Sequence, residues 1–333
     1  MEKIFAERLF SKRCKIPSGK PYKAFTSHPF TFPFPTAIMH SIVLLGENMR
    51  VLPECYACLE RLTKQTLGLC FGQKKISAAE QARITKIILS QLHGSFSSRT
   101  VPAELFSRLN REIKKQTRVH DPFLPRKTEE IHHARLVSKK LLAEHQPGSL
   151  YELLMFSVRG NSLDFFKPIE ESIRHMHEPA KLVAPGLAQL EQKLQQPCRI
   201  LFFADNSGES FFDLPLVKCL SRQHHVTYVV KSRPIQNDLT LKDLKTSRMH
   251  EQFLHVKGAG NDAVGIELKT LPPRLKKQLD RCDLIIAKGM GYYETFTELP
   301  LYRDKVFHLL MAKCRPVAKS LGVALHSFVL PQR

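Results

Sequence analysis

The alternation of short apolar strands with helical stretches after residue 195 is the feature that most constrains this fold. Residues 199–204 form an apolar run that ends in a polar loop, and residues 226–230 are rich in β-branched side chains. Similar runs, separated by helical patterns, follow at 253–256, 284–287 and 324–330. This alternation predicts a three-layer α/β/α, Rossmann-like fold, in which a parallel sheet carries helices on both faces.

The part of the chain before residue 195 is predicted to be helical. Over 129–145, apolar residues recur at spacings of three and four on one face, at Ile131, Ala134, Val137 and Leu141. Ser77 and Glu80 form a capping-box pattern ahead of a second helix, and Pro102 suits the first turn of a third.

A proline-rich segment sets the start of the chain apart. Pro29, Pro33 and Pro35 follow one another too closely for a helix or a central strand. We therefore expect an extended or poorly ordered leader over 1–48, a helical domain over 49–195 and an α/β domain over 196–333.

Composition excludes several classes of protein. Of the 333 residues, 43% are hydrophobic and 25% charged, which is enough apolar surface for a packed core. No apolar run reaches the ~18–20 residues that a membrane-spanning helix needs. Eight scattered cysteines, with no apolar segment ahead of a cleavage site, are typical of a cytoplasmic protein with reduced thiols.

The formal net charge of +20 is compatible with nucleic acid, an anionic membrane or a phosphorylated ligand as partner. The basic pairs are spread along the chain, at 74–75, 114–115, 139–140 and 276–277. Since there is no dense basic tail and no basic strand interleaved with aromatic residues, a solvated basic surface is favoured over nucleic-acid binding.

Polar, glycine-containing loops follow three of the predicted strands. The first strand leads into Asp205-Asn206-Ser207-Gly208-Glu209. The second leads to an Asn-Asp-x-Thr stretch at 237–240, and the fourth to a Lys-Gly stretch at 288–294. Because ligands bind beyond the carboxyl ends of parallel strands, we expect these loops to share one rim of the sheet.

The side chains of these loops suit a phosphate that is held through a metal ion. Asp205, Asn206 and Asp238 offer oxygen ligands for a divalent cation, while Lys288 supplies a positive charge. Gly208 lets the backbone approach a ligand ahead of a helix N-terminus, which favours an anion. The alternative is that each residue caps a helix or forms a turn, as a lone carboxylate after a strand usually does.

The same loops resemble motifs of the damage-control phosphatase family, also known as domain of unknown function 89. Its Asp-Asn-x-Gly-Glu motif is matched by Asp205, Asn206, Gly208 and Glu209, and its Asn-Asp-x-Thr element by Asn237, Asp238 and Thr240. Its Lys-Gly-x-Gly-Asn-Tyr-Glu loop is matched by Lys288, Gly289, Gly291, Tyr293 and Glu294, and its Gly-Asn-x-x-Asp element by Gly160, Asn161 and Asp164. Further likenesses lie at Asp121-Pro122-Phe123 with Lys127 and at Lys313-Cys314, so that the resemblance covers roughly residues 50–330.

The resemblance implies a metal-dependent phosphatase that hydrolyses small phosphorylated metabolites, such as sugar phosphates or damaged cofactor intermediates. It implies a divalent cation (Mn²⁺, Ni²⁺, Co²⁺ or Mg²⁺) bound by Asp205, Asn206 and Asp238. Asp205, Asp238 and Lys288 would be catalytic. Phosphate and substrate contacts would come from Lys288, Ser207, Gly208, Glu209, Asn161 and Asp164.

The expected reaction is in-line attack of a metal-bound water on the phosphoryl group. Asp205 as a nucleophile is the alternative, although Asn206 beside it favours a ligand role. A methyl-donor-dependent carboxyl methyltransferase is a competing enzyme class, but it needs no pair of metal-binding carboxylates. The third hypothesis is a non-enzymatic protein that binds nucleic acid.

The predicted function does not explain two features of the sequence, a pair of cysteines and one tyrosine. Cys55 and Cys58, which suggest the family branch common in archaea and bacteria, are compatible with a zinc, iron or redox site together with Cys70, or with simple packing of thiols. Tyr292 stands where the family usually has Asn, so a bulky phenol replaces a polar amide.

Overall fold

The computed structural model describes residues 49–162, 171, 174, 178 and 180–331. Its centre is a seven-stranded sheet in the order β1-β7-β6-β5-β2-β3-β4. The strands are β1 (Leu182–Val183), β2 (Arg199–Phe203), β3 (His225–Val230), β4 (Val256–Gly258), β5 (Leu284–Lys288), β6 (Val306–Met311) and β7 (Phe328–Val329). The expected leader over 1–48 lies outside the described residues.

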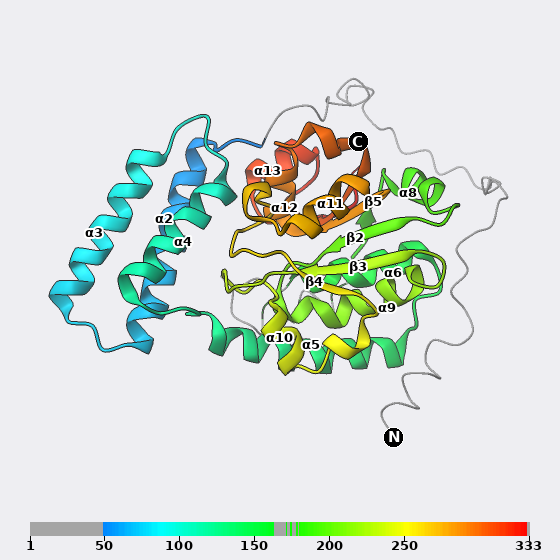
Figure 1. The fold of residues 1–333 in the computed structure, drawn as a ribbon, viewed down its shortest axis with the longest axis horizontal. Coiled ribbons are helices and arrows are strands. Elements are labelled where there is room, and N and C mark those ends of the chain that lie inside the picture. The colour runs from blue at the N-terminus through cyan, green and yellow to red at the C-terminus, as the bar shows by residue number, and fades with distance from the viewer. Residues whose placement is uncertain (1–48, 163–170, 172–173, 175–177, 179, 332–333) are drawn as a thin grey trace.

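Helices cover both faces of this sheet (Figure 1). One face carries α11 (Pro273–Arg281) and α12 (Gly289–Phe296), and the other carries α5 (Leu124–Glu144), α6 (Leu150–Arg159), α9 (Ser210–Leu220) and α10 (Leu241–Thr246). Beside the sheet lie α2 (Pro53–Gln73), α3 (Ala78–Ser95) and α4 (Pro102–Thr117), while α8 (Leu187–Lys193) and α13 (Arg315–Leu321) complete the helices named here.

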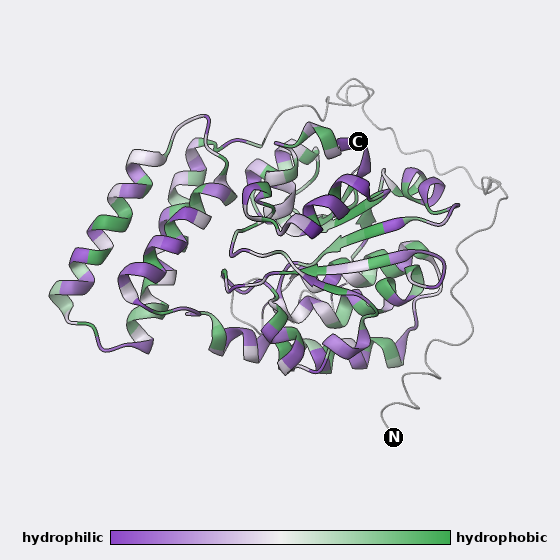
Figure 2. Ribbon diagram, viewed as in Figure 1, coloured by the Kyte–Doolittle hydropathy of each residue, from purple (hydrophilic) through white to green (hydrophobic). Residues whose placement is uncertain are grey.

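Side chains of the central strands alternate between two apolar cores. In β2, Ile200 and Phe202 face the core shared with α6 and α9, whereas Leu201 and Phe203 face the core shared with α11 and α12. Figure 2 shows the inner strands coloured mainly as hydrophobic. A sheet buried on both faces requires such strands, which is why the sequence there reads as short apolar runs.

The chain changes direction across the sheet at β2. It runs outward from β2 to β3 and β4, then returns to the other side of β2 for β5 and β6, and all of these neighbours are parallel. The carboxyl ends of β2 and β5 therefore form a topological switch point, where open α/β sheets bind ligands.

The predicted α/β fold is confirmed, with corrections to individual strands. β7 pairs antiparallel with β6, so the sheet is mixed and mostly parallel. The run at 253–256 contributes a strand only from Val256, because Phe253 instead stacks on Tyr228 with ring centroids 4.1 Å apart. β6 was not predicted, since a short run buried at every position has no periodicity that separates strand from helix.

The helices α2, α3 and α4 pack around an apolar core of their own, and we call them the bundle. Ser77 caps α3 as predicted, since its hydroxyl accepts a hydrogen bond from the amide of Glu80 at 3.3 Å. Pro102 occupies the first turn of α4, also as predicted. The bundle core includes Leu59 and Phe106, which return below because they also line a pocket.

The helices α5, α6 and α8 share their core with the sheet rather than with the bundle. Ala134 and Val137, on the predicted apolar face of α5, are buried in this core, and Ile131 and Leu141 pack against it. The division expected at residue 195 thus marks a change in sequence pattern, while the helices just before it lie on the sheet (Figure 1).

No helix in the described part of the chain is long and apolar enough to cross a membrane. In the part of the chain that the structure describes, the free thiols are those of Cys55, Cys58, Cys70, Cys198, Cys282 and Cys314.

Polar contacts from α4 fix the bundle to the sheet. Arg111 and Lys114 both pair with Asp262, at 2.8 and 2.6 Å. Burial alone would raise the pKa of Asp262, but the hydrogen bonds from Lys114 and Arg111 outweigh it and hold this pKa below its ordinary value.

Replacing Asp262 by Asn removes the charge that two cations share, and we expect the free energy of unfolding to fall by about 1–3 kcal/mol. Urea-induced unfolding measures this change. Glu80→Gln, which breaks an exposed pair with Arg83 on α3, is the control and should change the stability little. Equal losses in the two variants would contradict a special role for the Asp262 contacts.

Candidate functional site

The acidic loops that follow β2 and β3 are joined to each other at the switch point. The amide of Leu239 donates a hydrogen bond to the carbonyl oxygen of Asp205 at 2.7 Å. Asn206 and Asp238 form an antiparallel β-bridge. The structure thus brings Asp205, Asn206 and Asp238 together, as expected for loops that follow neighbouring parallel strands.

The carboxylate of Asp205 is held by amide donors and by a close approach of the backbone. Its Oδ2 accepts hydrogen bonds from Nδ2 of Asn161 at 2.9 Å and from Nδ2 of Asn206 at 3.3 Å. Gly289, the first residue after β5, has φ +80°, and a Cβ atom there would collide with this carboxylate. Both the backbone angle and the space therefore require glycine.

Burial and mutual repulsion raise the pKa of the acidic side chains. The pKa of Asp205 lies well above its ordinary value because the group is buried and because Glu209 and Asp238 are close. Burial raises the pKa of Asp238 to about 6, although the ammonium of Lys231, 3.6 Å from Oδ2, opposes this. That oxygen is buried and has no hydrogen-bond partner among the described residues.

A divalent cation fits this set of donors. A buried carboxylate oxygen that accepts no hydrogen bond, beside a second carboxyl of raised pKa, is a site that added positive charge would stabilise. Within the described residues, no group of three or more His, Cys, Asp and Glu side chains could hold a metal ion. A cation here would therefore need the Asn206 oxygen and the oxygens of water or ligand besides Asp205 and Asp238, as Mg²⁺ commonly does.

Lys288 lies beneath the acidic loops, in a buried ion cluster with Glu209 and Asp213. Its Nζ lies 2.5 Å from Glu209, 2.7 Å from Asp213 and 3.0 Å from the carbonyl oxygen of Ser157. An ammonium has three donors, and these acceptors use all of them. Burial would lower the pKa of Lys288, but the two carboxylates outweigh it and raise the pKa.

The other predicted contact residues support the loops from below or from the side. Asn161 is buried, and its amide joins Asp205, Glu209 and the backbone of Met311. Both the amide and the hydroxyl of Ser207 donate to the carbonyl oxygen of Asn237 at 2.9 Å. Asn161, Ser207 and Gly208 are not among the residues that line the pocket described below. Asp164 lies outside the described residues.

Tyr292, the departure from the family pattern, points away from the pocket into the core. Its hydroxyl accepts a hydrogen bond from Lys231 at 3.0 Å, and the same ammonium donates to the carbonyl oxygen of Gly265 at 2.7 Å. Lys231 also lies 4.3 Å from the centre of the Tyr292 ring. Through Lys231, the phenol therefore supports Asp238 rather than contacting a ligand.

Sequence reasoning missed Glu130 and did not single out Lys231. Glu130 is buried on α5, where it accepts hydrogen bonds from Nδ2 of Asn237 at 3.1 and 3.3 Å, and burial raises its pKa to about 7. Its position on a helix distant in sequence gave no signal. For Lys231 the sequence does carry a signal. This residue follows β3 directly and lies two residues after Val229, so its side chain is expected on the same face of the sheet, toward the α11 and α12 core.

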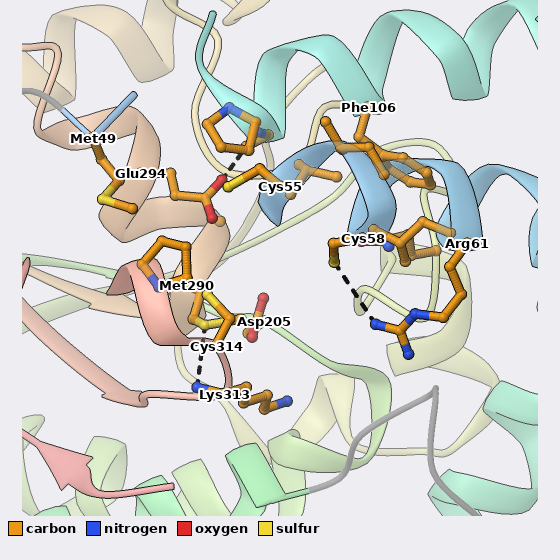
Figure 3. A pocket seen from close by; sticks show the side chains of 18 of the residues that line it. Met49, Cys55, Cys58, Arg61, Phe106, Asp205, Met290, Glu294, Lys313 and Cys314 are labelled. Carbon is orange, nitrogen blue, oxygen red and sulfur yellow. Dashed lines mark hydrogen bonds between the residues drawn. The ribbon is translucent and has the colours of Figure 1, made fainter. Parts of the chain in front are cut away.

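A pocket of about 530 Å³ opens over the acidic loops. Its polar side is lined by Asp205, Asn206, Gln236, Asn237, Asp238 and Lys313. Its other side comes largely from the bundle, and Figure 3 shows Cys55 and Phe106 on the bundle helices, with Asp205 and Lys313 on the other side of the space. Both the bundle and the sheet are therefore needed to form it.

The paired cysteines lie on this wall. Cys55 and Cys58 line the pocket together with Cys314, whereas Cys70 is buried in the bundle core. Burial raises the pKa of both Cys55 and Cys70, which disfavours the thiolate that metals and disulfide exchange require.

A mostly parallel sheet with acidic loops at its switch point, facing a pocket that holds a lysine, defines an α/β protein with a site for an anionic or metal-bound ligand. The chain belongs to the damage-control phosphatase ARMT1-like domain family, since the sequence model of that domain matches residues 51–329. The resemblance inferred from the motifs is thus confirmed.

Proteins of this kind from archaea match most of the chain. A damage-control phosphatase of Archaeoglobus fulgidus is 29% identical over 84% of this chain and 98% of its own length. An uncharacterized protein of Methanocaldococcus jannaschii is 30% identical over 86% of this chain and 97% of its own. A crystal structure of a DUF89 family protein from Pyrococcus horikoshii superposes with a TM-score of 0.73 at 25% identity, covering 86% of this chain and 99% of that one.

Lys288→Met should lower the free energy of unfolding by about 3–5 kcal/mol, because two buried carboxylates would lose the positive charge that compensates them. Urea unfolding measures this loss, with the exposed Lys276→Met on α11 as control. Adding Glu209→Gln to Lys288→Met should recover part of the stability, since one buried charge disappears. A stable Lys288→Met protein would contradict the structural role of this ammonium.

Tyr292→Phe should lower the free energy of unfolding by about 1–2 kcal/mol, because a buried ammonium loses one of its acceptors. Thermal or urea unfolding of the two proteins measures the difference. Unchanged stability would mean that the hydroxyl does not hold Lys231.

Proposed function

We propose that this chain is a metal-dependent phosphatase that hydrolyses small phosphorylated metabolites, such as sugar phosphates or damaged cofactor intermediates. The observation that carries the proposal is the pair of acidic loops at the switch point, whose buried carboxyl groups face a pocket. Membership of the family, and the name damage-control phosphatase borne by a relative that covers most of the chain, support phosphatase chemistry.

Asp205, Asn206 and Asp238 are the residues that would hold the cation, with Mn²⁺, Ni²⁺, Co²⁺ and Mg²⁺ as candidates. When bound, such an ion supplies Lewis acidity toward a phosphoryl oxygen and acidifies water. The Oδ2 atom of Asp238, which has no hydrogen-bond partner in the described residues, supports its assignment as a ligand. Asn161 fixes the orientation of Asp205 through its Nδ2 hydrogen bond.

Lys313 is the lysine that we assign to the phosphoryl group. It lines the same pocket as Asp205, and its charge opposes the rise in the pKa of that carboxyl, so the two groups lie within interaction range. A cation at this position would neutralise charge on an equatorial phosphoryl oxygen. Lys288 then acts by positioning, through Glu209, rather than by direct contact.

The size of the pocket favours a small ligand over a polymer. A volume of about 530 Å³ lies within the range of sites for metabolites and drug-sized molecules. The expectation of a cytoplasmic location stays a prediction.

The test is hydrolysis of p-nitrophenyl phosphate by metal-stripped protein that is re-supplied in turn with Mg²⁺, Mn²⁺, Co²⁺ and Ni²⁺. We expect metal to restore turnover, and Asp205→Asn and Asp238→Asn to lower it by about a hundredfold or more. Asp304→Asn, which changes an exposed carboxylate, is the matched control.

Thermal unfolding with and without metal gives a second measurement that does not depend on turnover. The metal that restores activity should stabilise the wild-type protein and the Asp304→Asn control, but not the Asp205→Asn protein. Full turnover without metal, or in either loop variant, would contradict the proposal.

A further inference from the structure

The pocket has a second half that the proposed chemistry does not use. Beyond the acidic loops it is lined by apolar side chains from the bundle and from the loops that face it, namely Met49, Leu59, Leu62, Phe106, Val264 and Met290. Figure 3 shows Phe106 on α4 and Met49 and Met290 on the neighbouring segments around this space. A phosphoryl group held at Asp205 would leave this space for the rest of the substrate.

Two apolar clusters meet at this half of the pocket. Leu62 and Val264 pack against the bundle core, while Met290 and Cys314 pack against a separate cluster that contains Met49. The walls are therefore continuous with buried apolar surface. Water against such walls finds few partners, so its release favours an apolar occupant.

The charged groups that line the pocket do not change the preference of this half for an apolar occupant. Glu54, Arg61 and Arg315 are exposed to solvent, whereas Leu59 and Phe106 are buried. Glu294 lies on the wall between α12 and the bundle, where burial raises its pKa to about 7 and its Oε2 accepts a hydrogen bond from the amide of Ala103 at 3.0 Å. A polyhydroxylated group would therefore lose hydrogen bonds to water that the apolar walls cannot replace.

We propose that this half of the pocket is a leaving-group subsite for an apolar group, so that the preferred substrates are phosphomonoesters of hydrophobic alcohols rather than of sugars. The inference rests on the proposed phosphatase function, and among the small phosphorylated metabolites named there it places sugar phosphates below esters of hydrophobic alcohols. Met49, Met290 and Cys55 line the pocket, and their polarizable sulfur atoms make favourable contacts with apolar and aromatic groups.

The experiment compares phosphomonoesters of primary alcohols, whose leaving groups differ in polarity far more than in intrinsic reactivity. Ethyl, butyl, hexyl and 2-phenylethyl phosphate are assayed with the metal-loaded enzyme beside glycerol 3-phosphate and glucose 6-phosphate. We expect kcat/KM to rise about two- to fourfold for each added methylene from ethyl to hexyl. Glucose 6-phosphate should be hydrolysed no better than ethyl phosphate. A flat alkyl series, or a preference for glucose 6-phosphate, would overturn the subsite while leaving the phosphatase intact.

A matched pair of variants assigns the effect to the pocket wall. Leu62→Gln places an amide on the wall and should reduce the gain in kcat/KM from ethyl to hexyl phosphate. Leu89→Gln changes a half-buried leucine of α3 that packs on the same bundle core but does not line the pocket, and it should leave this gain unchanged. Equal effects of both variants would overturn the assignment.

Binding of phosphonates decides the question if no substrate is turned over. Calorimetry with methyl-, butyl- and hexylphosphonate on the Mn²⁺-supplied protein measures affinity without hydrolysis. Affinity that rises with chain length, and rises less in Leu62→Gln, supports the subsite even if the phosphatase proposal fails. Equal affinities for the three phosphonates would overturn it.

Discussion

The buried contact between Lys288 and Glu209 is the interaction on which the rest of the site depends. A charge can stay in a protein interior only when it is paired and hydrogen-bonded, and Glu209 meets both conditions. It accepts hydrogen bonds from Asn161 at 2.8 Å and from Asn206 at 2.6 Å, in addition to the Lys288 ammonium. The end of β5, the residues after α6 and the loop after β2 are thereby tied to one carboxylate. Asp205 is oriented through Asn161 and Asn206, because the side-chain amides of both residues donate to Glu209 as well as to Asp205.

The polar and the apolar sides of the pocket come from different parts of the chain. The sheet supplies the acidic loops and Lys313, whereas the bundle supplies much of the apolar wall. The two are held in register by polar contacts, among them the Ser107 hydroxyl, which accepts the Val264 amide at 2.9 Å. Sequence changes in α2 and α4 can therefore alter what fits the pocket without disturbing the carboxylates.

Much of this arrangement can be read from the sequence, and side-chain parity explains both successes and failures. The acidic loops were found because each follows a buried strand whose apolar run is unambiguous. The side of the sheet on which the Lys288 side chain lies was not predicted. Leu284 and Ile286 face the α6 and α9 core, and Lys288 follows at the same two-residue spacing in β5. The alternation of side chains along β5 is therefore enough to place this ammonium on the α6 and α9 face of the sheet, below the carboxyl end of the strand.

Other features of the structure could not be predicted from the residues nearby in the sequence. β1 is two residues long and pairs with β7, and the antiparallel pairing of β7 with β6 depends on tertiary contacts rather than on its own residues. The pocket wall was also out of reach, because Phe106 and Met290 are far apart in sequence and meet only when the bundle docks. Glu130 belongs to the same class, since its partner Asn237 is 107 residues away.

The positive charge of the chain and the acidity of its pocket act over different distances. A formal net charge of +20 attracts anions to the surface over roughly the Debye length, about 8–10 Å in ordinary salt. At the floor of the pocket, Asp205 and Asp238 lie close enough for the second to raise the pKa of the first, while the charge of Lys313 opposes this rise. Positive charge added at the floor would stabilise both carboxyl groups in their ionised form and would attract an anionic ligand. The donor set of Asp205, Asn206 and Asp238 is the place in this pocket where such charge would be best stabilised.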